Sequence, residues 1–175
     1  MPYSFLVGGA RSGKSTLAVR LAAAFDGPVA VIATAEARDD DMAERIRAHR
    51  AARPSEWDVV EVPLGLLGAV EGVREDSSVI VDCLTLWVSN ALEDGTADVD
   101  VEGEASKVAS VLASRAAPSI VVSNEVGLGI VPANELARRY RDVLGRVNAA
   151  FAAEAERSFL VVAGRGLPLQ DVTPS

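Results

Sequence analysis

Apolar residues along this chain fall into short continuous runs that alternate with longer segments in which apolar positions recur every three or four residues. The continuous runs are typical of strands buried on both faces, and the longer spacing indicates amphipathic helices. Buried strands are predicted over residues 3–7, 28–33, 78–82, 119–123 and 159–163, with a further short strand over 59–62. Helices are predicted over residues 15–25, 40–52, 64–73, 84–92, 101–116 and 133–155, and an acidic loop over 93–100.

This alternation predicts an α/β fold with a mainly parallel sheet and helices on both of its faces. Ligands in such folds bind beyond the carboxyl ends of the strands. The sequence contains no internal repeat, low-complexity tract or linker, so residues 1–175 are expected to form a single domain.

The stretch GGARSGKS carries the first chemical signal. Gly8, Gly13, Lys14 and Ser15 match the phosphate-binding pattern G-x-x-x-x-G-K-[ST], and a predicted strand precedes them while a predicted helix follows. The glycines allow backbone N–H groups to wrap a phosphate chain, Lys14 would reach the β- and γ-phosphates, and Ser15 would hold Mg²⁺. The sequence therefore predicts a P-loop site for a nucleoside triphosphate.

Asp82 ends a predicted strand, where P-loop enzymes place a second acidic motif that holds the magnesium ion directly or through water. The alternative is that Asp82 caps the helix that begins two residues later. The metal role is favoured because the P-loop is present. The neighbouring Cys83 is expected to be a small packing residue, since nothing in the sequence places a base beside it.

The single histidine, His49, belongs to a polar stripe on the second predicted helix, where Asp41, Arg45, His49 and Arg53 recur every four residues. On spacing alone, a solvated face with ion pairs explains this pattern. Beside a triphosphate, however, Arg45, Arg50 and Arg53 would neutralise phosphate oxygens and disfavour protonation of His49. A neutral histidine can serve as a nucleophile, a base or a ligand.

Composition narrows the function classes. The formal net charge of −8 and the isoelectric point near 4.7 argue against a nucleic-acid partner, which would require clustered Lys and Arg. One cysteine allows no intrachain disulfide, and neither a signal peptide nor an apolar run long enough to span a bilayer is present. A cytoplasmic protein with a small-molecule substrate is expected.

Longer runs make the sequence recognisable. GGARSGKS, residues 32–57 with RIRAHR, residues 79–90, residues 123–148 with SNEVGLGIVP, and residues 160–169 together resemble the bifunctional adenosylcobinamide kinase and adenosylcobinamide-phosphate guanylyltransferase family of cobalamin biosynthesis. The resemblance covers nearly the whole chain and implies a RecA-like P-loop core and a homotrimer. It also implies that ATP or GTP phosphorylates adenosylcobinamide, after which GTP donates GMP through a histidine-linked intermediate, with Mg²⁺ as cofactor.

The resemblance assigns roles by position. His49 stands where the family carries its guanylylated histidine, and Lys14 is the second expected catalytic residue. The positions matched to nucleotide or metal contacts are Gly8, Gly9, Ala10, Arg11, Ser12, Gly13, Lys14, Ser15, Ala33, Thr34, Ala35, Arg50, Ala51, Ala52, Arg53, Glu61 and Asp82, with Ser15 and Asp82 as the metal ligands.

Several points stay open at this stage. The tail reads AGRGLPL where a shorter AGLPL-like turn is expected, and Ala133 stands where the family often has Glu. Asn124 and Glu125 could contact substrate or a second subunit, or form a locally bonded turn. Trp57 and Trp87 could cover a corrin ring but are more often core or interface residues. A simple small-molecule kinase without a covalent adduct and a nucleotide-dependent switch are the alternative functions.

Overall fold

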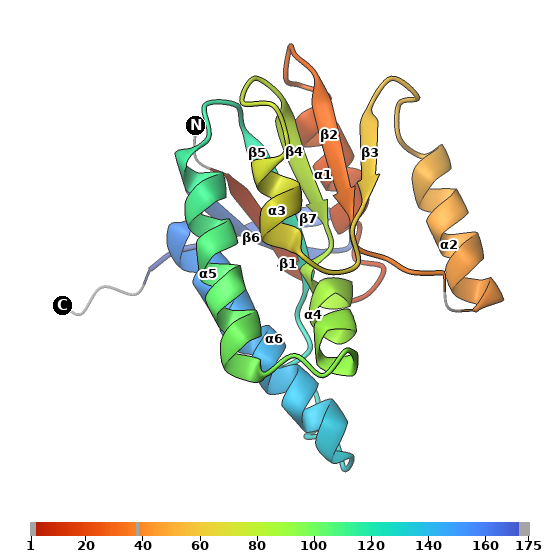
Figure 1. Ribbon diagram of the computed structural model, residues 1–175, viewed down its shortest axis with the longest axis vertical. Coiled ribbons are helices and arrows are strands. Elements are labelled where there is room, and N and C mark those ends of the chain that lie inside the picture. Colours follow the sequence, from red (N-terminus) through yellow and green to blue (C-terminus); the bar gives the residue numbers. More distant parts are fainter. Residues whose placement is uncertain (1–2, 38, 172–175) are drawn as a thin grey trace.

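The computed structural model describes residues 3–37 and 39–171, with the side chain of Arg45 outside this description. Strands and helices alternate along the chain for most of its length (Figure 1). The strands are β1 (Ser4–Gly8), β2 (Val29–Ala33), β3 (Asp58–Glu61), β4 (Ser78–Asp82), β5 (Ser119–Asn124), β6 (Arg157–Val162) and β7 (Arg165–Leu169). The helices are α1 (Lys14–Ala22), α2 (Asp40–Ala51), α3 (Leu66–Glu71), α4 (Leu84–Glu93), α5 (Asp98–Ser114) and α6 (Glu135–Glu154).

Within the described residues, seven strands form one sheet in the order β3-β2-β4-β5-β1-β6-β7. All neighbouring pairs are parallel except β6 and β7, which form an antiparallel hairpin at one edge. The predicted mainly parallel α/β sheet is thereby confirmed. The carboxyl ends of the parallel strands lie at one edge of the sheet, where ligands bind in such folds.

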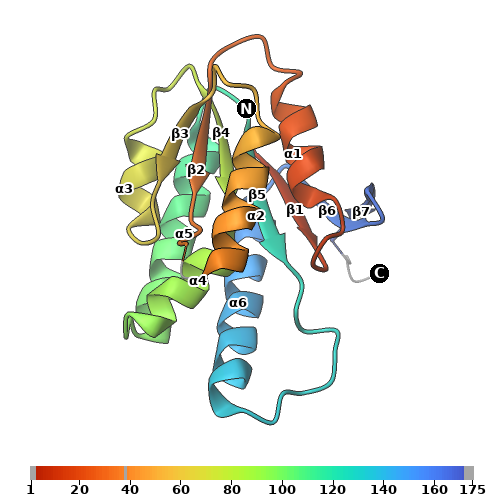
Figure 2. The same ribbon diagram turned by 90° about the vertical axis from the view of Figure 1, so that its right-hand side faces the viewer.

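The two faces of the sheet are covered by different helices (Figures 1 and 2). Alternate residues of β1 show the division, since Phe5 packs into a core with α3, α4, α5 and α6, whereas Leu6 packs against α1 on the opposite face. Burial of side chains on both faces explains why the central strands appear as continuous apolar runs. Trp87 is 1% exposed within the larger core, so its packing interpretation is confirmed.

Some boundaries differ from the sequence prediction. Residues 98–100, expected in an acidic loop, form the first turn of α5, where Asp98 and Asp100 are favourable beside the positive end of the helix dipole. The strand β3 is exposed at all four residues because it lies at the sheet edge. No helix among the described residues has both the length and the apolar character needed to cross a membrane.

The strand β7 is absent from the sequence prediction. Residues 165–169 contain Gly166 and Pro168, both of which are unfavourable in strands, and all five residues are exposed. An edge position tolerates them because one side of the strand needs no partner. Ala163 and Gly164 form the turn between β6 and β7 with φ angles of 50° and 75°, as a two-residue type I′ hairpin turn requires.

We predict that Phe151→Ala lowers the free energy of unfolding by about 3–5 kcal/mol, the range for loss of a buried aromatic ring. Phe151 is fully buried on α6, and its ring centroid lies 6.2 Å from that of Tyr3 and 6.4 Å from that of Phe5. The thermal midpoint should fall by roughly 10 °C, measured by circular dichroism. Leu136→Ala, at a residue 54% exposed on the same helix, is the control, and equal midpoints for the two variants would contradict this core assignment.

Candidate functional site

A cavity of about 640 Å³ opens at the carboxyl ends of the parallel strands, within the size range of small-molecule sites. Its walls come from the loop after β1, the start of α1, the ends of β2, β4 and β5, and one side of α2. Met42 and Ile46 are four residues apart in α2, so they lie on the same side of that helix. They line this cavity and do not enter either core.

The loop between β1 and α1 surrounds the Lys14 ammonium. Its Nζ donates to the carbonyl oxygens of Gly8 and Gly9 at 2.9 and 2.7 Å and lies 3.3 Å from Ser12 Oγ. Lys14 is 6% exposed, and burial lowers the pKa of its ammonium, an effect that the nearby Asp82 carboxylate opposes only in part. The loop thus holds one buried cation at the floor of the cavity.

The β6–β7 hairpin and the residue after β5 form backbone hydrogen bonds with this loop. The N–H of Gly164 donates to the carbonyl of Ser12 at 2.7 Å, and the N–H of Glu125 donates to the carbonyl of Gly8 at 3.1 Å. A Cβ on Gly8 would lie 2.3 Å from the carbonyl oxygen of Val161, which leaves no room for a side chain. Gly13 has a φ of +97° as well as a close approach to Gly164, so two requirements favour glycine there.

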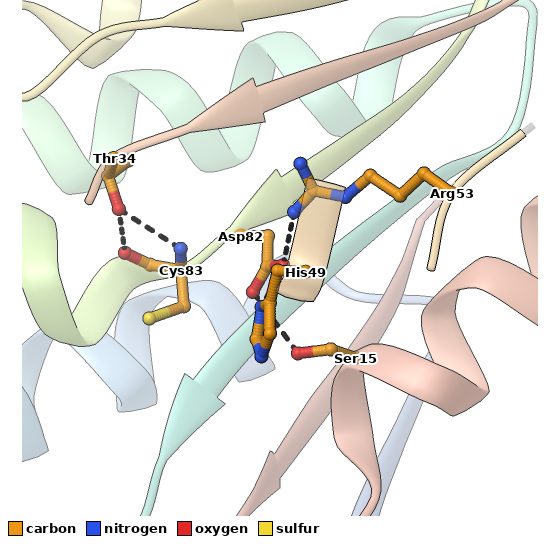
Figure 3. A network of polar contacts seen from close by, with 6 residues as sticks. All are labelled: Ser15, Thr34, His49, Arg53, Asp82 and Cys83. Atoms are coloured by element: carbon orange, nitrogen blue, oxygen red, sulfur yellow. Dashed lines mark hydrogen bonds and ion pairs between the residues drawn. The ribbon is translucent and has the colours of Figure 1, made fainter. Parts of the chain in front are cut away.

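The carboxylate of Asp82 connects three elements of the site (Figure 3). Its Oδ1 accepts a hydrogen bond from Ser15 Oγ at 3.3 Å, and its Oδ2 accepts one from Arg53 Nη2 at 2.7 Å. His49 Nδ1 lies 3.6 Å from the same Oδ2. The alternative role of Asp82 as a helix cap is not observed, because Cys83 is the N-cap of α4 and no side chain bonds that helix end.

Asp82 is an ionised acceptor in this arrangement. Burial raises the pKa of its carboxyl group, but the hydrogen bonds and charges of His49 and Arg53 outweigh burial and leave the pKa below its usual value. The Arg53 and Asp82 side chains are 8% and 9% exposed, so their ion pair is largely shielded from solvent. Burial raises the pKa of the adjacent Cys83 thiol, which agrees with its expected packing role.

Two arginines at the end of α2 and just after it have partners that the sequence did not indicate. Arg50 pairs with Glu61 at the end of β3, and Arg53 pairs with Asp82. The expectation that arginine charge disfavours protonation of His49 did not include these two carboxylates, each of which faces one of the arginines. The charged group that the structure places beside the His49 ring is Asp82, an anion.

Buried polar contacts fix the strand ends beneath the cavity. Thr34 Oγ1 accepts from the N–H of Cys83 at 3.0 Å and donates to its carbonyl at 2.6 Å (Figure 3). Asn90 Nδ2 donates to the carbonyls of Thr34 and Pro63 at 2.9 and 3.2 Å. These bonds connect the ends of β2 and β4 with the segment after β3, so the backbone around Asp82 is held from several directions.

Most of the predicted site residues meet at this cavity. Those that line it are Ala10, Arg11, Ser12, Gly13, Lys14, Ser15, Ala33, Ala35, His49, Arg50, Arg53, Glu61 and Asp82. The others do not line it: Gly8 and Thr34 are buried beneath it, while Gly9, Ala51 and Ala52 are exposed at the rim of the loop and the end of α2.

Sequence reasoning missed part of the lining. Thr85, Leu86 and Val122 contribute to the cavity, and Thr85 Oγ1 accepts from the N–H of Asn124 at 2.8 Å. Their position just beyond or within strand ends is the signal that could have identified them. Asn124 lines the cavity, whereas the Glu125 carboxylate accepts from the N–H of Gly127, as in a locally bonded turn.

Comparison with known proteins decides the family. The family model described as cobinamide kinase / cobinamide phosphate guanyltransferase matches residues 4–169. The chain belongs to this family.

Relatives within the cobinamide kinase / cobinamide phosphate guanyltransferase family match over almost the full length. The bifunctional adenosylcobalamin biosynthesis protein CobP of Pseudomonas aeruginosa is 46% identical over 167 residues, covering 94% of this chain and 95% of the relative. The bifunctional adenosylcobalamin biosynthesis protein CobU of Escherichia coli is 36% identical over 178 residues, covering 94% and 98%. As a family member, this chain is a bifunctional enzyme of cobalamin biosynthesis.

Solved structures agree on the fold. A KaiC-like protein from Pyrococcus horikoshii OT3 matches with a TM-score of 0.57 and 14% identity, covering 91% of this chain and 70% of that protein. An ATPase of a bacterial type III secretion system matches with a TM-score of 0.58 and 13% identity, covering 91% and 50%. This chain therefore shares its overall fold with these two proteins.

The packing of the phosphate loop predicts different responses at adjacent glycines. Gly8→Ala should lower the free energy of unfolding by about 1–3 kcal/mol, because backbone must move to admit the methyl group. Gly9→Ala should stay within about 0.5 kcal/mol of the parent, since a Cβ there meets nothing within 4 Å. Urea unfolding without nucleotide measures both, and equal losses would argue against the close contact with Val161.

Proposed function

We propose that this chain phosphorylates adenosylcobinamide with ATP or GTP and then transfers GMP from GTP to the product through His49. The products of the second reaction would be adenosylcobinamide-GDP and pyrophosphate. The observation that carries the proposal is that His49 faces the same cavity as the P-loop, with its ring beside Asp82. A single nucleotide site could then serve both reactions.

The phosphate loop would bind and orient the triphosphate in either reaction. Its backbone N–H groups and the N-terminus of α1 favour anions, and Lys14 lies at the floor of the cavity. Phosphate oxygens would replace the loop carbonyls as acceptors for Lys14 Nζ. Because the ammonium is buried, its attraction to developing phosphate charge is screened less than it would be in water.

Ser15 and Asp82 fit a magnesium ion. Their Oγ and Oδ1 atoms lie 3.3 Å apart, and a hydroxyl with one carboxylate is the donor set that P-loop proteins offer to Mg²⁺ beside substrate phosphates. When bound, the ion would stabilise the negative charge that builds on the leaving group.

Guanylyl transfer needs a nucleophile in addition to this cradle. The free imidazole nitrogen of His49 would form a bond to the α-phosphorus while the bond from that phosphorus to the bridging oxygen breaks and pyrophosphate leaves. A phosphate oxygen of the phosphorylated cobinamide would then displace the imidazole. Phosphoryl transfer from the γ-position needs no such intermediate, because the substrate hydroxyl can attack directly.

Label position in GTP distinguishes the two activities. His49→Ala should retain no label from α-labelled GTP after denaturation at alkaline pH, yet it should still transfer γ-phosphate to adenosylcobinamide. His49→Asn should give the same two results. Covalently bound GMP on the His49→Ala protein would overturn the histidine mechanism. If the parent enzyme transferred γ-phosphate to adenosylcobinamide but never bound GMP covalently, the result would favour a small-molecule kinase without a covalent intermediate.

Lys14→Ala should lower the rates of phosphoryl transfer and of guanylyl transfer by about 100-fold or more, since both reactions use the same phosphate loop.

A homotrimer is part of the proposal. It is supported by the family resemblance and by an exposed apolar segment between β5 and α6, in which Leu128 and Ile130 are 84% and 99% exposed. A contiguous group of such residues is unfavourable in water and is typical of an interface.

Light scattering at micromolar concentration should give three times the 18.3 kDa mass of one chain. The double variant Leu128→Ser with Ile130→Ser should shift the mass toward one chain, whereas Val99→Ser, at a residue 73% exposed on α5, should leave it unchanged. A mass of 18.3 kDa for the parent protein would remove the trimer.

A further inference from the structure

The two ring nitrogens of His49 face different surroundings. Nδ1 lies 3.6 Å from Asp82 Oδ2, whereas the other nitrogen, Nε2, points away from that carboxylate (Figure 3). The imidazole is 51% exposed and the carboxylate 9% exposed, so the ring extends from a buried anchor into the cavity. This asymmetry distinguishes the two nitrogens chemically.

The carboxylate is held independently of His49. Arg53 Nη2 donates to Oδ2 at 2.7 Å, and Ser15 Oγ donates to Oδ1 at 3.3 Å, so donors from the segment after α2 and from α1 hold both oxygens. An ionised carboxylate accepts hydrogen bonds and cannot donate. A neutral imidazole whose Nδ1 faces it therefore carries its proton on Nδ1, which leaves the lone pair on Nε2.

We propose that Asp82 is a positioning residue for His49, fixing its proton on Nδ1 so that Nε2 is the nitrogen that receives GMP. This inference rests on the proposed function, because it names the reacting atom of the same histidine. Nothing in the spacing of the sequence distinguishes the two nitrogens, since Asp82 lies on another element.

One bond to phosphorus forms and one breaks in each of the two steps, formation of the GMP intermediate and its transfer to the cobinamide phosphate. The Nε2 lone pair forms the bond to the α-phosphorus, and the electrons of the broken phosphorus–oxygen bond leave with pyrophosphate. The ring then carries a positive charge with the proton still on Nδ1, opposite Asp82 Oδ2. When the cobinamide phosphate oxygen attacks, the electrons of the nitrogen–phosphorus bond return to Nε2. Asp82 neither gains nor loses a proton, and its charge stabilises the imidazolium while it lasts.

The two oxygens of Asp82 therefore have separate tasks. Oδ1 faces Ser15 on the phosphate-loop side, and Oδ2 faces His49 and Arg53 on the α2 side. Removal of Ser15 Oγ affects the first side alone, whereas removal of the Asp82 carboxylate affects both. Ser15→Ala is thus the matched control for Asp82→Ala.

The tautomer can be measured without nucleotide or metal. His49 is the single histidine of the chain, so ¹⁵N-imidazole labelling reports one ring. In spectra recorded at alkaline pH, the parent and Ser15→Ala should show a protonated Nδ1 and an unprotonated Nε2. Asp82→Ala should move the proton toward Nε2. A parent protein protonated on Nε2, or an unchanged tautomer in a folded Asp82→Ala protein, would overturn the proposal.

The adduct provides a second readout that needs no variant. After reaction of the labelled parent enzyme with GTP and Mg²⁺ and removal of nucleotide at alkaline pH, coupling between ³¹P and ¹⁵N identifies the bonded nitrogen. We expect coupling to Nε2, and coupling to Nδ1 would overturn the inference while leaving the histidine mechanism intact. Failure to form any adduct would overturn the proposed function, and the tautomer measurement would still decide the role of Asp82.

Discussion

Parallel pairing of the central strands determines where the site can form. β5 lies between β4 and β1, and its register places Asn124 opposite Gly8 and Val122 opposite Asp82. The phosphate loop and the acidic strand end therefore lie one strand apart, close enough for Ser15 in the first turn of α1 to reach Asp82. A shift of one residue in β4 would turn Asp82 to the opposite face of the sheet, which would remove it from the cavity.

The helix that carries His49 depends on this same carboxylate. No residue of α2 whose side chain is described is fully buried, so the helix gains little from a hydrophobic core. Exposed ion pairs such as Arg50 with Glu61 contribute about 0–1 kcal/mol, whereas breaking a buried pair costs about 3–5 kcal/mol. The Arg53–Asp82 pair is therefore a stronger attachment than the Arg50–Glu61 pair, and it joins the segment directly after α2 to the end of β4.

The sequence predicted the parts of the molecule that follow from local patterns. The phosphate loop, the central strands and the position of Asp82 at a strand end all depend on residues that are adjacent in the chain, and these structural features were predicted correctly. The partners of Arg50 and Arg53 were missed because Glu61 and Asp82 are 11 and 29 positions away and come close only through strand order. β7 was missed because Gly166 and Pro168 are unfavourable in strands and hide the pattern of an exposed edge strand. The cavity-lining position of Met42 and Ile46 could not be predicted, because apolar residues at helical spacing look the same in the sequence whether they face a core or a cavity.

Net charge and local charge lead to different conclusions in this protein. The formal charge of −8 argues against an extended polyanion such as nucleic acid, yet among the described residues that line the cavity, the cations Arg11, Lys14, Arg50 and Arg53 outnumber the carboxylates of Glu61 and Asp82. This local excess of positive charge lies in a concave site, where low-dielectric walls strengthen its field. A compact polyanion with the dimensions of a nucleotide triphosphate would meet that field over its whole length, whereas a long nucleic acid would also meet the acidic remainder of the surface.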